Sequence, residues 1–327
     1  MKRISLLLLL LLTVGIIGFA QEYDDPQVQA DLLFNEGNSF LRAGNFAAAV
    51  TKYNEALDIV KDHRYYYQKA IALLRLQRFE DSINAFNSAL QHGSDMETVG
   101  LGLSGAYMHR GEELFSAGNY SGAITQYKNA IEINPDPRYY NRLAIASRRS
   151  NQEAQAVEAF QKAIELDPEY AVAYAGLGGT YVGMQRFDDA IEMYKKALEL
   201  EPTMQQARVG LSASYTAQGN EHLNRGRARE AISVLEEAVE VNPRHHQAHL
   251  LLAVAYNRTG QPQNAEQHAR SAIEYKQRGR LGGEYFELGV ALKNQGRRQE
   301  AIRAFEEAAK DPTYRRNAEY ELEELRR

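Results

Sequence analysis

The sequence predicts an all-α solenoid built from about eight helix hairpins, and three observations support this prediction. One phrase recurs along the chain of 327 residues, for example at residues 44–56 and again at residues 186–197. Within each phrase, apolar residues stand at i, i+4 and i+7, which is one face of an α-helix. Between the phrases, Gly and Pro occur at regular places where a helix can end. No strand pattern appears in the repeats.

Composition narrows the class of protein. The chain has 38 Lys and Arg against 43 Asp and Glu, 44% hydrophobic residues, and neither Cys nor Trp. So much apolar side chain can bury a core of ordinary size, which argues against a disordered chain. The lack of Cys excludes disulfide scaffolds, thiolate chemistry and a lipid-anchored bacterial lipoprotein. The modest net charge of −5 predicts no general nucleic-acid binding.

The first segment of the chain predicts export. Lys2 and Arg3 precede an apolar run at residues 4–20, which ends in small residues of the kind that signal peptidase reads. We therefore expect residues 1–20 to be a secretory signal peptide, followed by a short linker at residues 21–29. The alternative is an uncleaved anchor at residues 4–20, because this run lies at the lower limit of a membrane-spanning helix. In both cases the positive-inside bias places the rest of the chain across the membrane.

Aligned on the recurring phrase, the chain divides into eight units. They start near residues 30, 63, 104, 137, 171, 212, 246 and 282. The two steps of 41 residues exceed the common step of 34 by about two helical turns, so the additions preserve the helix face. We expect a lengthened first helix in the third and sixth units and a duplicated three-hairpin block. The predicted blocks are units 1–2 at 30–96, units 3–5 at 97–204, units 6–8 at 205–315, and a polar-backed capping helix at 316–327.

Two columns of small residues predict how the helices pack. The first column contains only Gly or Ala: Gly37, Ala70, Gly111, Ala144, Gly178, Gly219, Ala253 and Gly289. The second contains only Ala: Ala56, Ala89, Ala130, Ala163, Ala197, Ala238, Ala272 and Ala308. Small residues here let two helices approach closely, while an aromatic side chain fills the remaining gap.

Helix-terminating residues mark the ends of helices in most of the units, although units one, two and seven lack the closing proline. Between the two helices of a unit stands a glycine that can take a positive φ: Gly44, Gly118, Gly226, Gly260 or Gly296. After the second helix comes a proline, which cannot continue a helix interior: Pro135, Pro168, Pro202, Pro243 or Pro312. Each unit is therefore predicted to be a helix hairpin with one apolar side that it cannot bury alone.

These units resemble the tetratricopeptide repeat (TPR) family over about residues 30–315. The fifth unit carries the family's signature residues: Tyr174, Leu177, Gly178, Tyr181, Ala190, Tyr194, Ala197 and Pro202. The seventh unit departs from the pattern, since Ala269 replaces the usual aromatic residue and Pro262 opens its second helix. The resemblance implies a right-handed α-solenoid whose concave face, lined by the first helix of each hairpin, binds a protein or peptide partner.

The resemblance places two sets of residues on that face. A polar, basic set suits an acidic segment or a terminal carboxylate: Arg64, Tyr67, Arg138, Asn141, Arg142, Arg148 and Arg149. An apolar set in the later units suits an extended or helical peptide: Leu250, Val254, Phe286 and Val290. The basic set matches only the last step of the family's peptide-carboxylate clamp, so chaperone-tail binding is not expected. The alternative for the basic set is a solvated helix face.

Two motifs that could carry chemistry have simpler explanations. Residues 100–105 fit the dinucleotide fingerprint G-x-G-x-x-G, but no strand pattern precedes them. His245, His246 and His249 include two imidazoles one helical turn apart, which leaves a metal-dependent module as a minor alternative to an exposed polar helix start. The repeats contain no serine elbow, phosphate loop or paired carboxylates, so we expect no enzyme.

The sequence thus predicts a non-catalytic, exported TPR scaffold or adaptor for cell-envelope assembly or secretion. We expect a periplasmic location in a two-membrane bacterium, with an inner-membrane anchor or secretion as alternatives. No cofactor, metal or nucleic acid is expected, and membrane contact is expected only if residues 4–20 stay attached. The rival prediction is a structural envelope protein that self-assembles into homo-oligomers through the apolar strip of units five to eight.

Overall fold

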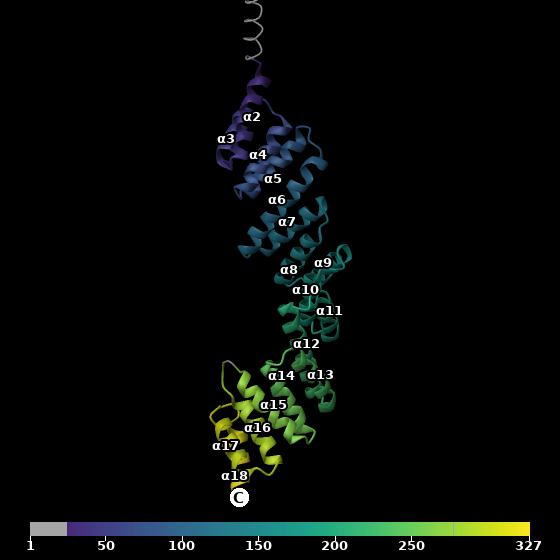
Figure 1. Cartoon of the computed structure of the whole chain (residues 1–327), viewed down its shortest axis with the longest axis vertical. Helices are drawn as coiled ribbons and strands as arrows, with labels where there is room; N and C mark the ends of the chain where they lie inside the picture. The colour runs from purple at the N-terminus through teal and green to yellow at the C-terminus, as the bar shows by residue number, and fades with distance from the viewer. Residues whose placement is uncertain (1–24, 277) are drawn as a thin grey trace, which may run out of the picture. The chain divides into compact units, whose positions relative to one another are not determined.

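The computed structural model describes residues 25–276 and 278–327, and the expected signal or anchor segment lies outside them. Within these ranges every regular element is a helix, labelled α2 to α18 in Figure 1, so the all-α prediction is confirmed. None of the helices in these ranges is both long enough and apolar enough to cross a membrane. The chain forms two compact units, each of which contains several of the predicted hairpins. From here on, unit 1 is the compact unit that ends at Gln155, and unit 2 is the compact unit Ala156–Arg327.

Unit 1 consists of helices that follow the predicted register. Its elements are α2 (Pro26–Arg42), α3 (Phe46–Ile59), α4 (His63–Arg75), α5 (Phe79–Gln91), α6 (Met96–Ser116), α7 (Tyr120–Ile133) and α8 (Pro137–Arg149). Helix α2 packs on α3, α4 on α5, and α6 on α7, and each second helix also contacts the first helix of the next pair. Three predicted hairpins therefore form a continuous stack that α8 extends.

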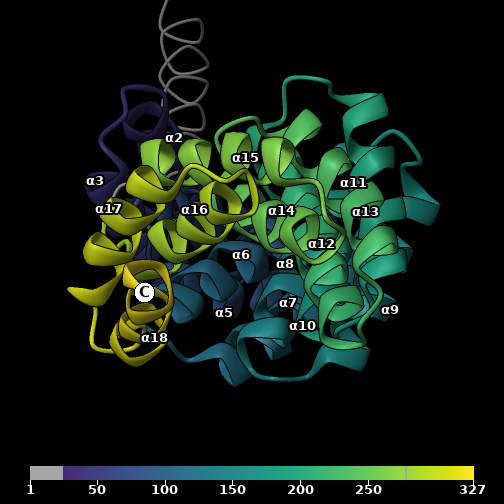
Figure 2. The same cartoon turned by 90° about the horizontal axis from the view of Figure 1, so that it is seen from below.

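Unit 2 continues the same alternation. Helix α9 (Glu153–Leu166) contains the boundary, and the others are α10 (Ala171–Gly183), α11 (Phe187–Leu200), α12 (Gln205–Asn224), α13 (Ala228–Val241), α14 (His246–Arg258), α15 (Pro262–Tyr275), α16 (Gly282–Asn294), α17 (Arg298–Ala309) and α18 (Arg315–Arg326). Figure 2 shows α18 beside α17, on which it packs with Ala318 and Leu322 buried. The predicted C-terminal capping helix is therefore present.

Helix α2 begins earlier than the sequence predicts. The linker was expected to reach residue 29, but the helix starts at Pro26. Asp25 Oδ1 accepts a hydrogen bond from the Gln27 backbone N–H at 2.8 Å, and proline has the φ that a first helical position requires. The linker prediction is therefore wrong for residues 26–29, because this cap precedes the first repeat phrase.

The two longest helices in the described part of the chain are α6 and α12, with 21 and 20 residues. They stand where the repeat register steps by 41 residues instead of about 34. The boundary between the two compact units falls inside α9. The predicted blocks at 97–204 and 205–315 do not follow that boundary and stay a prediction.

Both columns of small residues lie in the core. All eight alanines of the second column are 0% exposed. In the first column, a Cβ added at Gly37 would lie 2.6 Å from the Tyr53 ring, and one added at Gly289 would lie 2.7 Å from the Phe305 ring. A helix and its hairpin partner are thus in contact through a glycine on one side and a ring on the other.

The predicted turns are also confirmed. The five turn glycines all have positive φ, between 71° and 79°. In the other hairpins the same place is taken by Gln77, Asn151 and Gln185, with φ between 56° and 58°. A side chain in this left-handed region costs about 1 kcal/mol relative to glycine. The five closing prolines all lie in the connections that follow a second helix.

Candidate functional site

The first helices of unit 1 surround a pocket. Helix α4 contacts both α2 and α6, and between them lies a cavity of about 260 Å³. Its lining residues are Phe34, His63, Arg64, Tyr67, Gln68, Ser94 and Thr98. The structure therefore brings together two predicted groove residues, Arg64 and Tyr67, at the face where the resemblance places the partner.

Two aromatic side chains from adjacent hairpins line the pocket. Phe34 in α2 and Tyr67 in α4 each stand three residues before a member of the first small-residue column. The Tyr67 ring centroid lies 5.8 Å from that of Phe86 in an edge-on contact, and the Phe34 centroid lies 4.8 Å from that of Tyr65. Both rings are half-buried, so the core fixes their position and leaves one side open to the pocket.

The sequence prediction missed Phe34, although the repeat register could have found it. One step of 33 residues back from Tyr67 leads to this position in the first hairpin. The other missed lining residues are His63 and Gln68 in α4, Ser94 in the turn before α6, and Thr98 in the first turn of α6. The approach of Ser94 and Thr98 depends on how α5 connects to α6, and the helical period does not report that connection.

One polar atom in the pocket has no partner. Ser94 lies in the turn between α5 and α6, and its Oγ is buried without a hydrogen bond to any other described residue. A buried hydroxyl without a partner costs about 1–3 kcal/mol. A ligand with a peptide N–H or C=O group would recover this energy, so Ser94 is suited to hydrogen-bond a bound backbone.

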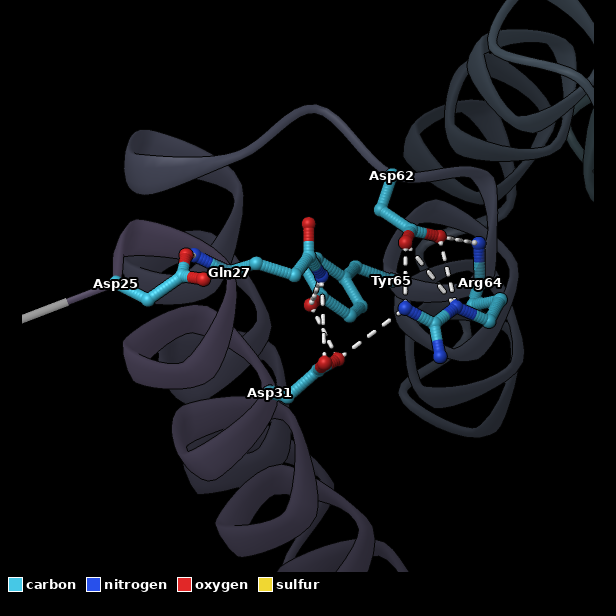
Figure 3. A network of polar contacts seen from close by, with 6 residues as sticks. All are labelled: Asp25, Gln27, Asp31, Asp62, Arg64 and Tyr65. Carbon is cyan, nitrogen blue, oxygen red and sulfur yellow. Dashed lines mark hydrogen bonds and ion pairs between the residues drawn. The ribbon is translucent and has the colours of Figure 1, made fainter. Parts of the chain in front are cut away.

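A network of polar contacts holds Arg64 at the edge of the pocket (Figure 3). Its Nη2 lies 2.6 Å from Asp62 Oδ2 and 3.2 Å from Asp31 Oδ1. Tyr65 donates its hydroxyl to the same Asp31 oxygen at 2.6 Å, and Gln27 Nε2 donates to the Tyr65 hydroxyl at 2.9 Å. The hydrogen bond from Arg64 lowers the pKa of Asp62. Two carboxylates therefore more than offset the charge of Arg64, and this network carries one negative charge in excess.

The same arrangement recurs at α8. Arg138 Nη2 lies 2.5 Å from Oδ2 of Asp136, the residue that caps this helix. One turn further on, Arg142 Nε lies 3.0 Å from Glu112 Oε1 in α6. Each of these arginines thus has a carboxylate partner within its own unit. An acidic ligand would have to compete with these ion pairs, which the sequence alone did not reveal.

The remaining predicted polar residues of α8 differ in exposure. Asn141 is only 6% exposed, because it shares a helix face with the fully buried Ala144 at i+3. Asn141 therefore offers little surface to a partner, and its partner-binding role stays a prediction. Arg148 is half-buried and Arg149 is exposed, and neither forms an ion pair with another described residue. These two arginines are the part of the basic set that is still available to an acidic group.

The predicted apolar set lies on two neighbouring helices of unit 2. Leu250 and Val254 belong to α14, and Phe286 and Val290 belong to α16, which contacts α14. All four are half-buried, and the Phe286 ring lies 5.5 Å from that of Phe305 and 5.9 Å from that of Tyr314. The unit's own core thus covers part of this strip, and its use by a partner stays a prediction.

The histidines near the start of α14 form buried contacts. His249 is 7% exposed, and its Nε2 lies 3.0 Å from the Pro243 carbonyl oxygen. Because a carbonyl oxygen only accepts, Nε2 of His249 must carry the ring proton. Nδ1 of His249 therefore accepts a hydrogen bond from Nδ1–H of His268 at 2.9 Å. His245 Nδ1 lies 2.8 Å from Ser212 Oγ. The expectation of an exposed polar helix start is wrong, since both histidines face neighbouring helices.

These contacts also bear on the metal alternative. Both ring nitrogens of His249 are engaged within the protein. Within residues 25–276 and 278–327, no group of three or more His, Asp or Glu is arranged to hold a metal ion. His268 stacks on Tyr256 at 5.5 Å next to Ala269, the position that lacks the usual aromatic residue. The histidine pair therefore fills core space in the seventh hairpin.

Comparison with known sequences identifies the repeats. Family models described as tetratricopeptide repeat or TPR repeat match most of the chain: residues 34–97, 111–147, 137–170, 171–204, 216–279 and 285–310. The matched residues lie in both compact units. All of these models describe the same repeat, and none describes a catalytic family.

Individual relatives are similar over part of their length. Hsp70-Hsp90 organizing protein 1 of Glycine max is 33% identical over 209 residues, which are 54% of this chain and 36% of that protein. Small glutamine-rich tetratricopeptide repeat-containing protein 2 of Mycosarcoma maydis is 34% identical over 125 residues, 38% of this chain and 34% of that protein. The chain spans between 18% and 36% of the length of such curated relatives.

A solved structure supports the fold. The C-terminal part of a TPR repeat-containing protein from Cytophaga hutchinsonii matches with a TM-score of 0.52 at 16% identity, over 75% of this chain and 96% of that chain. The helix bounds, the buried small-residue columns and the matched family models agree. The chain therefore belongs to the tetratricopeptide repeat family.

Proposed function

We propose that the chain is a non-catalytic adaptor that binds an extended peptide segment of a partner protein in the pocket between α2, α4 and α6. The pocket itself carries this proposal: two aromatic walls, Phe34 and Tyr67, stand beside the unpartnered hydroxyl of Ser94. An apolar side chain of the peptide would lie between the rings, and its backbone would hydrogen-bond to Ser94.

The comparisons support the general class of function. Relatives named as Hsp70-Hsp90 organizing proteins share the repeat, and TPR repeats mediate protein–protein interactions. The charge at the edge of the pocket favours an apolar anchor over a chaperone-type acidic tail, because Arg64 already has two carboxylate partners. We expect an affinity for one peptide of around micromolar, about −8 kcal/mol.

We further propose that the adaptor acts outside the cytoplasm, in cell-envelope assembly or secretion. The apolar run at residues 4–20, after Lys2 and Arg3, supports export. A periplasmic location in a two-membrane bacterium fits this segment, with an inner-membrane anchor or secretion as the alternatives. A reporter fused after residue 20 tests this step: activity of an export-dependent reporter supports it, and activity only of a cytoplasmic reporter contradicts it.

The peptide proposal is tested by selecting ligands from a library of random peptides displayed on phage. The purified full chain serves as bait, and each selected peptide is screened again against Tyr67→Ala and Tyr320→Ala. Tyr320 is the matched control, since it is 63% exposed on α18. We expect enriched peptides to share an apolar residue and to lose binding only with Tyr67→Ala. Failure to enrich any peptide, or equal binding to both variants, would contradict the proposal.

A milder variant separates binding from folding. Ser94→Ala removes the unpartnered hydroxyl and does not open a cavity of any size. We expect it to keep or slightly raise the unfolding midpoint, because a buried orphan group is lost, and to weaken the selected peptides several-fold. A Ser94→Ala protein that binds them unchanged would remove the backbone contact from the proposal.

A further inference from the structure

A column of the repeat that the binding pocket does not use contains an unusual residue. One position before the first small-residue column, the eight hairpins carry Glu36, Lys69, Arg110, Leu143, Leu177, Gln218, Leu252 and Leu288. The four leucines are all buried, with 0–6% exposure. The fold therefore offers this position as a core site, and Lys69 in α4 occupies it with an amine.

The other polar members of this column have partners. Glu36 Oε2 lies 3.1 Å from Lys52 Nζ. Arg110 Nη1 lies 2.6 Å from Glu113 Oε2. Gln218 Nε2 donates a hydrogen bond to Asp188 Oδ1 at 2.5 Å. Lys69 is half-buried and makes no hydrogen bond or ion pair with any residue in the described part of the chain. A cationic group in such a place lacks the counter-charge that its equivalents have.

Lys69 lines a cavity of about 220 Å³ between α3, α4 and α5. The cavity is distinct from the proposed peptide pocket, to which α4 contributes Arg64 and Tyr67 on another face. Its full lining is Val50, Asn54, Tyr66, Lys69, Leu73, Arg78, Asp81, Asn84, Ala85 and Ser88. Val50, Tyr66, Leu73 and Ala85 form the apolar part, and two amides, a hydroxyl and the three charged groups form the polar part.

The charged groups of this cavity leave one positive charge in excess. Arg78 Nη2 lies 2.7 Å from Asp81 Oδ2, so these two balance each other. Neither amide side chain, of Asn54 or of Asn84, hydrogen-bonds another described residue. Lys69 therefore lines the cavity together with two side-chain amide groups whose N–H donors are available, and with no free carboxylate.

Unit 2 contains the same cavity without the lysine. Between α15, α16 and α17 lies a space of about 200 Å³, where Tyr285, Leu288 and Leu292 take the places of Tyr66, Lys69 and Leu73. The cavity thus arises from the repeat geometry. What distinguishes unit 1 is the amine at a position where the equivalent hairpin carries leucine.

We propose that the cavity of unit 1 binds the carboxylate side chain of an acidic residue in a partner's peptide segment, with Lys69 Nζ as its counter-charge. The carboxylate supplies the negative charge that the cavity lacks, and the amides of Asn54 and Asn84 would donate to its oxygens. This site goes beyond the proposed peptide pocket, since it uses a different face of α4 and a charged ligand group.

The electrostatic surroundings agree with this geometry. Burial is the main cause that lowers the pKa of Lys69, and the nearby Arg78 and Lys61 lower it further. Asp81 in α5 and Asp58 in α3 act in the opposite direction. A bound carboxylate would raise the pKa of Lys69, so binding should weaken at high pH as the amine loses its proton.

The probe for the test is an acetylated, amidated peptide of alternating Ala and Glu, compared with its Ala and Gln twin, at physiological salt. A water-soluble carbodiimide joins a carboxylate to a contacting amine as an isopeptide bond, with the oxygen leaving in the urea by-product. Mass spectrometry then identifies the coupled lysine. We expect the Glu peptide to couple to Lys69 before the other lysines, and the Gln peptide not to couple.

The variant Lys69→Leu supplies the affinity control, because four other hairpins bury leucine at this position. We expect it to fold at least as stably as the wild type and to bind the Glu peptide about tenfold more weakly. Equal affinity, or coupling spread over other lysines, would overturn the proposal and leave Lys69 as a side chain whose stem covers the core while its amine meets water.

The same probe separates this site from the peptide pocket. Tyr67→Ala should leave binding of the Glu peptide unchanged, even if the peptide-pocket proposal fails. If Tyr67→Ala abolishes binding of the Glu peptide and Lys69→Leu does not, the acidic segment lies in the peptide pocket, and the Lys69 site is overturned.

Discussion

Arg142 Nε in α8 lies 3.0 Å from Glu112 Oε1 in α6. The same glutamate oxygen accepts a hydrogen bond from the Tyr127 hydroxyl at 3.0 Å. These contacts join three helices of unit 1 through one carboxylate. Arg142 is thus held by its own unit, although its position in the repeat suggested a partner-binding role.

The first prediction concerns this ion pair. Arg142→Glu places two carboxylates together at Glu112 and should lower the free energy of unfolding by about 1 kcal/mol. Arg149→Glu is the control, since Arg149 is exposed and forms no ion pair within residues 25–276 and 278–327; it should change stability by less than about 0.5 kcal/mol. Urea unfolding of both variants measures the difference. Equal stabilities would show that the Arg142 contact contributes nothing.

A second prediction follows from the buried histidine pair. Burial and the neighbouring His249 lower the pKa of His268 from 6.5 to about 4, while Glu236 acts to raise it. The unfolded chain therefore binds a proton at higher pH than the folded chain. The stability contributed by neutral His268 is complete above about pH 6.5 and is lost as the pH falls through 4, by about 3 kcal/mol at most.

Unfolding free energies at several values between pH 7 and pH 4 test this dependence. His268→Phe removes the titrating group and keeps a ring beside Tyr256, so its stability should vary less over this range. An identical slope in the variant and the wild type would assign the acid sensitivity to other groups.

The third prediction uses the turns between the helices of a hairpin. Gln185 has a φ of 58°, where Gly296 has 74° in an equivalent turn. Gln185→Gly should raise stability by up to about 1 kcal/mol, and Gly296→Ala should lower it by about the same amount. Nothing lies within 4 Å of a Cβ at Gly296, so its loss would reflect the backbone alone. Thermal unfolding measures both, and a destabilised Gln185→Gly would contradict this explanation.

A fourth prediction concerns the contact between a small residue and a ring. Gly289→Ala brings a Cβ to within 2.7 Å of Phe305 and should cost about 1–3 kcal/mol. Gly105→Ala is the matched control in a helix interior, because nothing lies within 4 Å of its Cβ; it should stabilise by about 0.5–1 kcal/mol. Equal effects in urea unfolding would mean that Phe305 moves aside without cost.

The sequence predicted the parts of the structure that depend on periodicity. Every hairpin has a small residue at the positions of Gly37 and Ala56, and this recurrence predicts that both residues lie in the core. Gly44 is likewise predicted to lie in a turn with positive φ. The repeat register also located Tyr67 on the face that forms the pocket. These features follow from local chain geometry, which a repeat shows many times over.

The parts that the sequence did not predict depend on single contacts between different helices. Arg64 reaches Asp31 in the preceding hairpin, and His249 pairs with His268 in the following helix. Such contacts depend on side-chain rotamers and helix separations that do not recur from hairpin to hairpin. Ser94 carried no sequence signal either, because it is the turn between α5 and α6 that brings it to the pocket.

The proposed adaptor function depends on a peptide that binds between Phe34 and Tyr67. Its test is calorimetric titration of a phage-selected peptide into the wild type, Tyr67→Ala and Tyr320→Ala. We expect micromolar binding to the wild type and to Tyr320→Ala, and a loss of at least about tenfold in Tyr67→Ala. Equal affinity for all three proteins, with the fold of each intact, would place the peptide elsewhere and overturn the proposal.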